Sequence, residues 1–400
     1  MASTFLVNGG NYLYNVLLAK KLAPSDFAQA GLLINLLLVF SFLAMTFQIV
    51  AAKFSVSFEG HVLDQFINWL KKVSLKIGFI LLVLISVLSQ PLSEFFQLEN
   101  DWALPTLSMV LPVFFLMSVE RGRLQGNEQF VRLSVSYQTE VWTRFVLTFG
   151  MLYFIPGIQL EMVISLAIFG SIFMGFFPIR SRFNFIPLTG FSAENKQLVW
   201  SFFLLTGSYE CAQILINYSD VLLVKHYFTS AQAGWFTSMA LIGKVVYFLT
   251  WMLAMVLVPK VLNAKKKSLP FKGIMVKYVL VISAFCALLS VLVYLFPREI
   301  ILLLFDDSYI EIAPLLWRYA VATGLFSICN LFVYFFLSID KRRLVLIAII
   351  FGLIQLVCYV FFHDSLRQII QVQIVVMIIL LLTMLISFFL VKDHPKSLSI

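Results

Sequence analysis

A pattern that occurs twice, about half a chain apart, restricts the folds open to this sequence. Residues 15–20 (NVLLAK) and 25–31 (SDFAQAG) are matched by residues 220–225 (DVLLVK) and 229–234 (TSAQAG). Each copy ends a long apolar stretch and crosses a short turn into the next one. Two such copies in 400 residues indicate two similar bundles, each built from about half of the chain.

The composition places both bundles in a lipid bilayer. Hydrophobic residues make up 61% of the chain and charged residues only 12%, and 42 residues are Phe. A soluble domain has about 25% charged residues. A chain this apolar has more hydrophobic surface than one soluble core can cover, so lipid must be its solvent. The four cysteines lie in apolar stretches without metal-type spacing, and we expect neither a metal site nor a cofactor.

Twelve apolar segments approach or exceed the length of about 20 residues that crosses a bilayer as a helix. They are residues 3–19, 27–52, 75–96, 102–119, 133–155, 160–179, 198–224, 232–258, 274–296, 312–338, 344–362 and 368–391. We therefore predict an all-α polytopic membrane protein with about 12 transmembrane helices in two six-helix lobes around a central cavity. The predicted parts are an N-terminal lobe (1–182), a cytoplasmic linker (183–197), a C-terminal lobe (198–391) and a cytoplasmic tail (392–400).

The basic residues predict the orientation of the chain. Of 29 Lys and Arg residues, 21 fall in or beside loops on one side of the twelve-span model and 6 on the other. The positive-inside rule then places both termini in the cytoplasm, here of a bacterial inner membrane. Because the basic residues are scattered among short loops, the net charge of +9 does not indicate nucleic-acid binding. In the loop after the second span, apolar and polar residues alternate over residues 58–72, which predicts an amphipathic helix on the cytoplasmic interface.

Polar residues inside two apolar segments form matching stripes. One stripe, at steps of three and four residues in segment 198–224, consists of Glu210, Gln213, Asn217 and Asp220. The other, in segment 3–19, consists of Asn8, Asn11 and Asn15. Such residues either line a water-filled cavity or hydrogen-bond between helices in a dry bundle. Two carboxylates in one stripe exceed what packing needs, which favours the cavity.

Two further sites place charge in the membrane. Glu140 and Arg144 are four residues apart, and their spacing fits either an intrahelical ion pair or direct contact with a substrate. Lys244 lies near the middle of its segment, with Glu210 or Asp220 as its expected partner. Cations at this depth suit an anionic headgroup, whereas carboxylates suit a coupling H⁺ or Na⁺. The predicted substrate-binding residues are Arg144, Lys244, Glu140, Asn11, Asn15 and Asn217, and the predicted ion-coupling residues are Asp220 and Glu210.

Several short stretches, in this order along the chain, carry a family resemblance. They are Gly10-Asn11-Tyr12 with Leu22-Ala23-Pro24-Ser25-Asp26-Phe27, Arg121-Gly122-Arg123-Leu124-Gln125-Gly126 followed by Phe130, Asp220-Val221-Leu222-Leu223 with Ala233-Gly234-Trp235, and Leu304-Phe305 with Tyr309. The chain resembles bacterial polysaccharide flippases of the Wzx type, within the multidrug/oligosaccharidyl-lipid/polysaccharide exporter superfamily. The resemblance implies twelve to fourteen helices in two lobes. It also implies export of a lipid-pyrophosphate-linked oligosaccharide, as in O-antigen synthesis, from the inner to the outer leaflet.

The sequence therefore predicts a flippase rather than an enzyme. Its expected partners are a lipid-linked oligosaccharide, membrane lipid, H⁺ or Na⁺, and polysaccharide assembly proteins. One alternative is a cation-coupled multidrug antiporter of the same superfamily, which would rely on acidic cavity residues and would not need Arg144 and Lys244. Another is a membrane glycan polymerase or glycosyltransferase, but such an enzyme would normally carry a large outer loop, and the loops here are short. A nucleotide-driven pump is disfavoured because the sequence has no phosphate-binding loop that ends in Gly-Lys-Ser/Thr.

Overall fold

The computed structural model describes residues 2–155, 157–179, 191–266, 269–339 and 341–391. Within these ranges the protein is built from helices and contains no β-strand, which confirms the all-α prediction. The helices of the first half are α1 (Ala2–Lys21), α2 (Pro24–Ser57), α3 (Gly60–Val87), α4 (Ser89–Phe95), α5 (Ala103–Ser108), α6 (Leu111–Gly126), α7 (Phe130–Phe154) and α8 (Leu160–Phe176). Those of the second half are α9 (Ala193–Tyr227), α10 (Ser230–Lys266), α11 (Lys272–Leu295), α12 (Pro297–Leu304), α13 (Ala313–Ser338), α14 (Arg342–Phe361) and α15 (Leu366–Leu390).

Each of the twelve predicted segments coincides with one helix or with two consecutive helices. Among the described residues, seven helices have both the length and the apolar composition of a membrane span. An eighth is added when α3 and α4, which meet at a bend of 67°, are taken as one span. The protein is thus a multi-pass, all-helical membrane protein.

Short turns with proline set several of the helix boundaries. Proline lacks a backbone N–H and has a fixed φ, so it fits the first turn of a helix, where that N–H has no intrahelical partner. Pro24 begins α2, Pro112 lies in the first turn of α6, and Pro297 begins α12. Ser365 precedes α15, and its side chain accepts a hydrogen bond from the Gln368 N–H, as an N-cap residue does.

The prediction of an interfacial helix over residues 58–72 is wrong. Residues 60–72 are the first part of α3, which continues without a break to Val87. Several of these residues are buried, including Phe66, Leu70 and the charged Lys71. Lys71 can be buried because its ammonium pairs with the carboxylate of Glu120 on α6.

The packing of the chain defines two units. Unit 1 consists of Met1–Asn15 and Asp26–Ile214, and unit 2 consists of Val16–Ser25 and Leu215–Ile400. The divisions therefore fall inside α1 and α9, the first helices of the two halves of the chain, and inside α2 just after its start. The lobes predicted from sequence follow those halves, whereas packing assigns Val16–Ser25 to unit 2 and the first part of α9 to unit 1. The predicted linker is helical from residue 193 onward, while residues 183–190 and the tail 392–400 lie outside the described residues.

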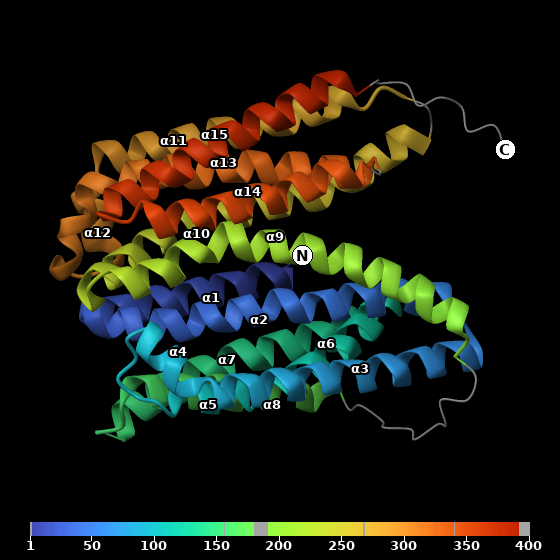
Figure 1. Ribbon diagram of the computed structural model, residues 1–400, viewed down its shortest axis with the longest axis horizontal. Helices are drawn as coiled ribbons and strands as arrows, with labels where there is room; N and C mark the ends of the chain where they lie inside the picture. Colours follow the sequence, from blue (N-terminus) through green and yellow to red (C-terminus); the bar gives the residue numbers. More distant parts are fainter. Residues whose placement is uncertain (1, 156, 180–190, 267–268, 340, 392–400) are drawn as a thin grey trace. The chain divides into compact units, whose positions relative to one another are not determined.

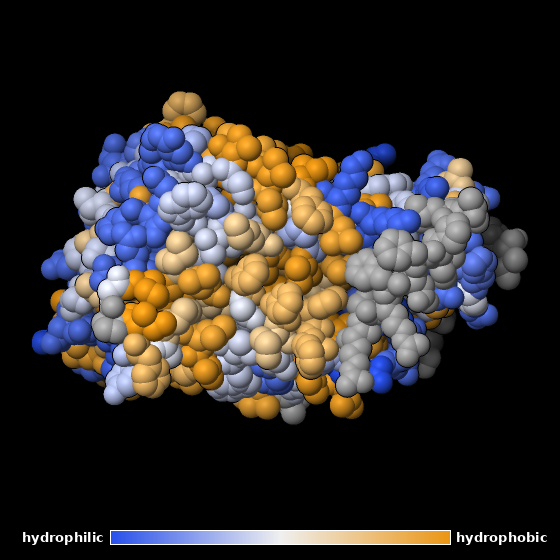
Figure 2. Space-filling view, turned by 90° about the horizontal axis from the view of Figure 1, so that it is seen from below, coloured by the Kyte–Doolittle hydropathy of each residue, from blue (hydrophilic) through white to orange (hydrophobic). Residues whose placement is uncertain are grey.

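Within unit 1, α7 packs along α8 and α3 packs along α6, with α5 against α8. Within unit 2, α13 is the central helix and contacts α10, α11 and α15 (Figure 1). The face seen in Figure 2 has apolar side chains across its middle and hydrophilic ones toward its ends. Phe79 and Val83 of α3 and Phe173 of α8 are examples of large apolar side chains that unit 1 leaves exposed. A bilayer covers such a band.

Candidate functional site

In the asparagine stripe of α1, one side chain forms a hydrogen bond within its own helix. The Asn15 side-chain amide donates to the carbonyl oxygen of Asn11, one turn earlier, at 2.8 Å. A hydrogen bond to another helix is made instead by the neighbouring Tyr14, whose hydroxyl lies 2.9 Å from the Thr148 hydroxyl on α7. Asn11 and Asn15 are both half-buried. The structure thus brings these two predicted residues together but shows Tyr14 as the tertiary contact.

The predicted ion pair on α7 is present and has a third member. The Glu140 carboxylate accepts from Arg144 at 2.7 Å and pairs with Arg121 of α6 at 2.9 Å. The exposed fractions are only 8% for Glu140, 6% for Arg144 and 2% for Arg121. The predicted segment 102–119 ends before Arg121, which places this residue in a loop. In the structure it lies inside α6, more than one turn before the helix ends at Gly126.

The surroundings of Arg121 fix its guanidinium in place. Its Nε donates to the Ser136 hydroxyl at 3.0 Å, and Ser136 in turn donates to the carbonyl oxygen of Gly175 at 2.7 Å. The guanidinium also lies over the ring of Tyr137, 3.9 Å from its centroid. The Tyr137 hydroxyl donates to Gln48 of α2 at 2.8 Å. Arg121 is therefore held by contacts that join α2, α6, α7 and α8.

A second charged cluster lies nearby along α6. The Glu120 carboxylate pairs with Lys71 of α3 and accepts from Arg123 Nε at 2.8 Å. Glu120 is fully buried. Together the two clusters of unit 1 contain four cationic side chains and two carboxylates: Lys71, Arg121, Arg123, Arg144, Glu120 and Glu140. These six groups thus carry an excess of positive charge, which favours an anion as a further partner.

In unit 2 the predicted residues Asp220 and Lys244 belong to one cluster. Asp220 is fully buried and accepts from the Tyr319 hydroxyl on α13 at 3.0 Å and from the N–H of Val221 at 2.8 Å. Lys244 of α10 interacts electrostatically with Asp220, one of the two partners that the sequence predicts for it. Its ammonium lies 5.6 Å from the ring centroid of Tyr218. Tyr319 is not predictable from the sequence, because a tyrosine in an apolar segment gives no signal of its partner.

The polar stripe of α9 spans the division between the two units. Glu210 and Gln213 precede it and are buried, while Asn217 and Asp220 follow it. The structure therefore brings together three subsets of the predicted residues: Asn11 with Asn15, Glu140 with Arg144, and Asp220 with Lys244. Within the described ranges, no three His, Cys, Asp or Glu side chains are grouped as metal ligands.

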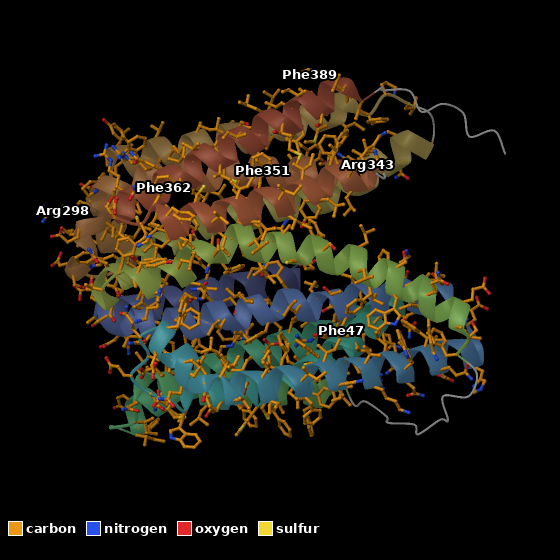
Figure 3. The ribbon with its side chains drawn as sticks, in the orientation of Figure 1. Phe47, Arg298, Arg343, Phe351, Phe362 and Phe389 are labelled. Carbon is orange, nitrogen blue, oxygen red and sulfur yellow. The ribbon has the colours of Figure 1, made fainter. Side chains whose placement is uncertain are left out.

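Two basic residues of unit 2 lie at opposite ends of that unit. Arg298 of α12 lies at one end of the unit and Arg343 of α14 lies at the other (Figure 3). The sequence predicts that these two residues lie on opposite sides of the membrane.

In unit 1, Phe47, also labelled in Figure 3, packs against Phe115 at 5.5 Å and Phe203 at 5.0 Å between ring centroids. Aromatic contacts of this kind hold the first part of α9 in unit 1.

Comparison with solved structures shows a shared fold. The chain is similar to a multidrug resistance MATE family transporter of the MOP superfamily in its inward-facing conformation, with a TM-score of 0.80 and 14% identity over 95% of this chain and 94% of the other. It is also similar to the lipid II flippase MurJ in an inward closed conformation, with a TM-score of 0.77 and 14% identity over 96% of this chain and 86% of the other. An outward-facing MATE transporter gives a TM-score of 0.65 at 16% identity over 97% and 93% of the two chains.

No protein-family model matches the sequence, and no curated protein is similar to it in sequence. The structural similarities, at 14–16% identity, show the fold alone. That fold is the one of membrane transporters and flippases, and the polar clusters described above lie within its helices.

Proposed function

We propose that the protein flips a lipid-pyrophosphate-linked oligosaccharide from the inner to the outer leaflet of the bacterial cytoplasmic membrane, for synthesis of a surface polysaccharide such as O-antigen. The observation that supports this most strongly is the positive excess buried in unit 1, centred on Glu140 between Arg121 and Arg144. Charged side chains are costly inside a membrane and usually serve a polar substrate. Guanidinium groups suit phosphates because they donate two parallel hydrogen bonds.

The proposed mechanism is alternating access. The lobes 1–182 and 198–391 would rock about a central site that opens in turn to each side, with both termini in the cytoplasm. Proteins of similar fold include a lipid II flippase and transporters in inward-facing and outward-facing conformations, and these similarities support the proposal. Partners would be the lipid-linked oligosaccharide, surrounding lipid and polysaccharide assembly proteins.

The predicted residues take different roles in this proposal. Arg144 and Lys244 bind the anionic headgroup, and Glu140 orients Arg144 through their 2.7 Å contact. Asn11, Asn15 and Asn217 supply hydrogen-bonding groups for the sugar. Asp220, and after it Glu210, bind the H⁺ or Na⁺ whose gradient biases the cycle.

A reconstituted assay tests the substrate. Liposomes containing the purified protein and a fluorescent polyprenyl-pyrophosphate sugar are treated with an impermeant quencher, and the rate at which protected lipid becomes accessible is measured. We expect Arg144→Gln to slow flipping at least tenfold, because the guanidinium contact to the headgroup is lost. Arg132→Gln is the matched control, since Arg132 is an exposed arginine at the start of the same helix. Equal rates in the two variants would reject the proposed headgroup site.

A second candidate is a cation-coupled multidrug antiporter, which the buried carboxylates Asp220 and Glu210 favour. The same liposomes with a fluorescent lipophilic cation and an imposed H⁺ or Na⁺ gradient distinguish the two. Gradient-driven accumulation of the dye, without movement of the pyrophosphate lipid, would favour the antiporter.

A further inference from the structure

Three stretches that are far apart in the sequence meet in unit 2. They are the turn between α1 and α2 at Leu22–Pro24, the start of α10 at Gly234 and Trp235, and the 3₁₀ helix η2 (Asp307–Ile312), which carries Ser308 and Tyr309. We call these residues the latch. All of them belong to unit 2, because packing assigns Val16–Ser25 to that unit.

One contact of the latch is a buried tyrosine on the backbone of the turn. The Tyr309 hydroxyl donates to the carbonyl oxygen of Leu22 at 3.0 Å. Tyr309 is fully buried, and its ring packs against Phe305 with 5.4 Å between centroids. Trp235 steadies the segment that carries Tyr309, since its indole N–H donates to the carbonyl oxygen of Ser308 at 2.9 Å. The tyrosine is therefore held in position to bond the turn.

The other contact is a close approach of two backbones. A Cβ added at Gly234 would collide with the carbonyl oxygen of Pro24, and its next neighbours are further backbone atoms of Pro24. Backbone atoms, unlike the end of a flexible side chain, cannot move aside cheaply. The contact between α10 and the turn thus requires glycine at residue 234. In both of these contacts the turn contributes backbone atoms, the carbonyl oxygen of Leu22 and that of Pro24.

The position of the turn in the chain gives the latch its significance. Val16–Ser25 packs in unit 2, but Met1–Asn15 before it and Asp26–Ile214 after it pack in unit 1. Any movement of unit 1 against unit 2 must therefore either bend the chain near residues 15 and 26 or detach the turn. The hydrogen bond from Tyr309 and the backbone contact with Gly234 are each weak enough to break in a transport cycle.

We propose that the latch is a releasable closure: Gly234 and Tyr309 hold the α1–α2 turn while this face of the transporter is shut, and they release it when that face opens. This inference rests on the alternating access proposed above. It assigns a functional role to three of the stretches that carry the family resemblance. In this view Gly234 and Tyr309 position the turn and do not touch the substrate.

The test measures release of the turn directly and needs no substrate. Ala19, which is fully buried at the end of α1 in unit 2, is changed to cysteine in a variant that lacks the four native cysteines. The labelling rate of this introduced thiol by an impermeant maleimide is measured in right-side-out and inside-out vesicles. We expect Tyr309→Phe to raise the rate roughly fivefold in one vesicle orientation, the factor that one neutral hydrogen bond supplies. Gly234→Ala should raise it further, because it separates the two backbones.

Two matched variants serve as controls. Gly273→Ala places a Cβ in open space at the start of α11, and Tyr294→Phe removes the hydroxyl of an exposed tyrosine of the same helix. Neither should change the labelling rate. If Tyr309→Phe and Gly234→Ala expose the introduced thiol no faster than these controls, the turn is a permanent anchor and the latch is rejected. If they expose it faster but the wild type does not flip the pyrophosphate lipid, the latch stands and only the proposed substrate fails.

Discussion

Replacing Glu140 with glutamine removes the one carboxylate that lies between Arg121 and Arg144. Both guanidinium groups pair with it, at 2.9 and 2.7 Å, and all three residues are at least nine-tenths buried. Breaking one buried ion pair by removing a single partner costs about 3–5 kcal/mol, because the remaining charge stays buried without compensation. Glutamine keeps one acceptor oxygen for one arginine. We therefore expect Glu140→Gln to lower the free energy of unfolding by roughly 3 kcal/mol, toward the lower end of that range.

The geometry also predicts the order of effects among the three residues. After Arg144→Gln, Glu140 still pairs with Arg121, so this change should cost less, about 1–2 kcal/mol. The double variant Glu140→Gln/Arg144→Gln should be more stable than Glu140→Gln alone, because it leaves one uncompensated guanidinium instead of two. Arg121 keeps its Ser136 and Tyr137 contacts in either case.

The measurement is equilibrium unfolding of the purified protein in mixed micelles, followed by tryptophan fluorescence during titration with a denaturing detergent. The control is Arg132→Gln, which changes an exposed arginine of the same helix and should stay within about 0.5 kcal/mol of the wild type. If Arg144→Gln destabilises the protein as much as Glu140→Gln, the carboxylate does not bridge two guanidinium groups and the reasoning is refuted.

Three further predictions concern packing, ion coupling and orientation. In the same unfolding assay, Gly122→Ala should destabilise the protein by about 1–3 kcal/mol, because the added Cβ would collide with the Gln48 carbonyl oxygen. Gly150→Ala is the control: its Cβ would enter open space, and the change should stabilise α7 by about 0.5–1 kcal/mol. Asp220→Asn should abolish the dependence of flipping on an imposed ion gradient yet leave substrate binding intact; gradient-dependent flipping that survives would point to Glu210. In intact cells, an impermeant maleimide should label a cysteine at Asp364 and not one at Leu269; the reverse pattern would invert the proposed orientation.

Local patterns in the sequence predicted much of the fold. Hydropathy along the chain located the helices because each membrane helix satisfies its own backbone hydrogen bonds and needs only a long apolar run. The contact between Glu140 and Arg144 was predictable because residues four apart on one helix are neighbours. In both cases the residues that determine the structural feature lie within one segment of the sequence.

The missed features depend on contacts between segments that are distant in sequence. Arg121 and Lys71 looked like loop residues because each lies near the end of an apolar run, and only the fold shows their buried carboxylates. Tyr319 meets Asp220 across 99 residues, which no local pattern reveals. The division of α9 after Ile214 is likewise invisible in the sequence, since the helix itself is continuous and only its packing partners change.

The two charged clusters differ in a way that separates their proposed roles. In unit 1, Glu140 is shared by two arginines, so the three groups keep a net positive charge that an anionic headgroup can neutralise. In unit 2, Asp220 accepts two hydrogen bonds and interacts electrostatically with Lys244, which carries the opposite charge. In the proposed cycle, a proton or Na⁺ that binds Asp220 would compete with Lys244 and free that ammonium for another anion. Cation binding in unit 2 would then make Lys244 available to bind the headgroup. In this way the ion gradient would be coupled to substrate binding.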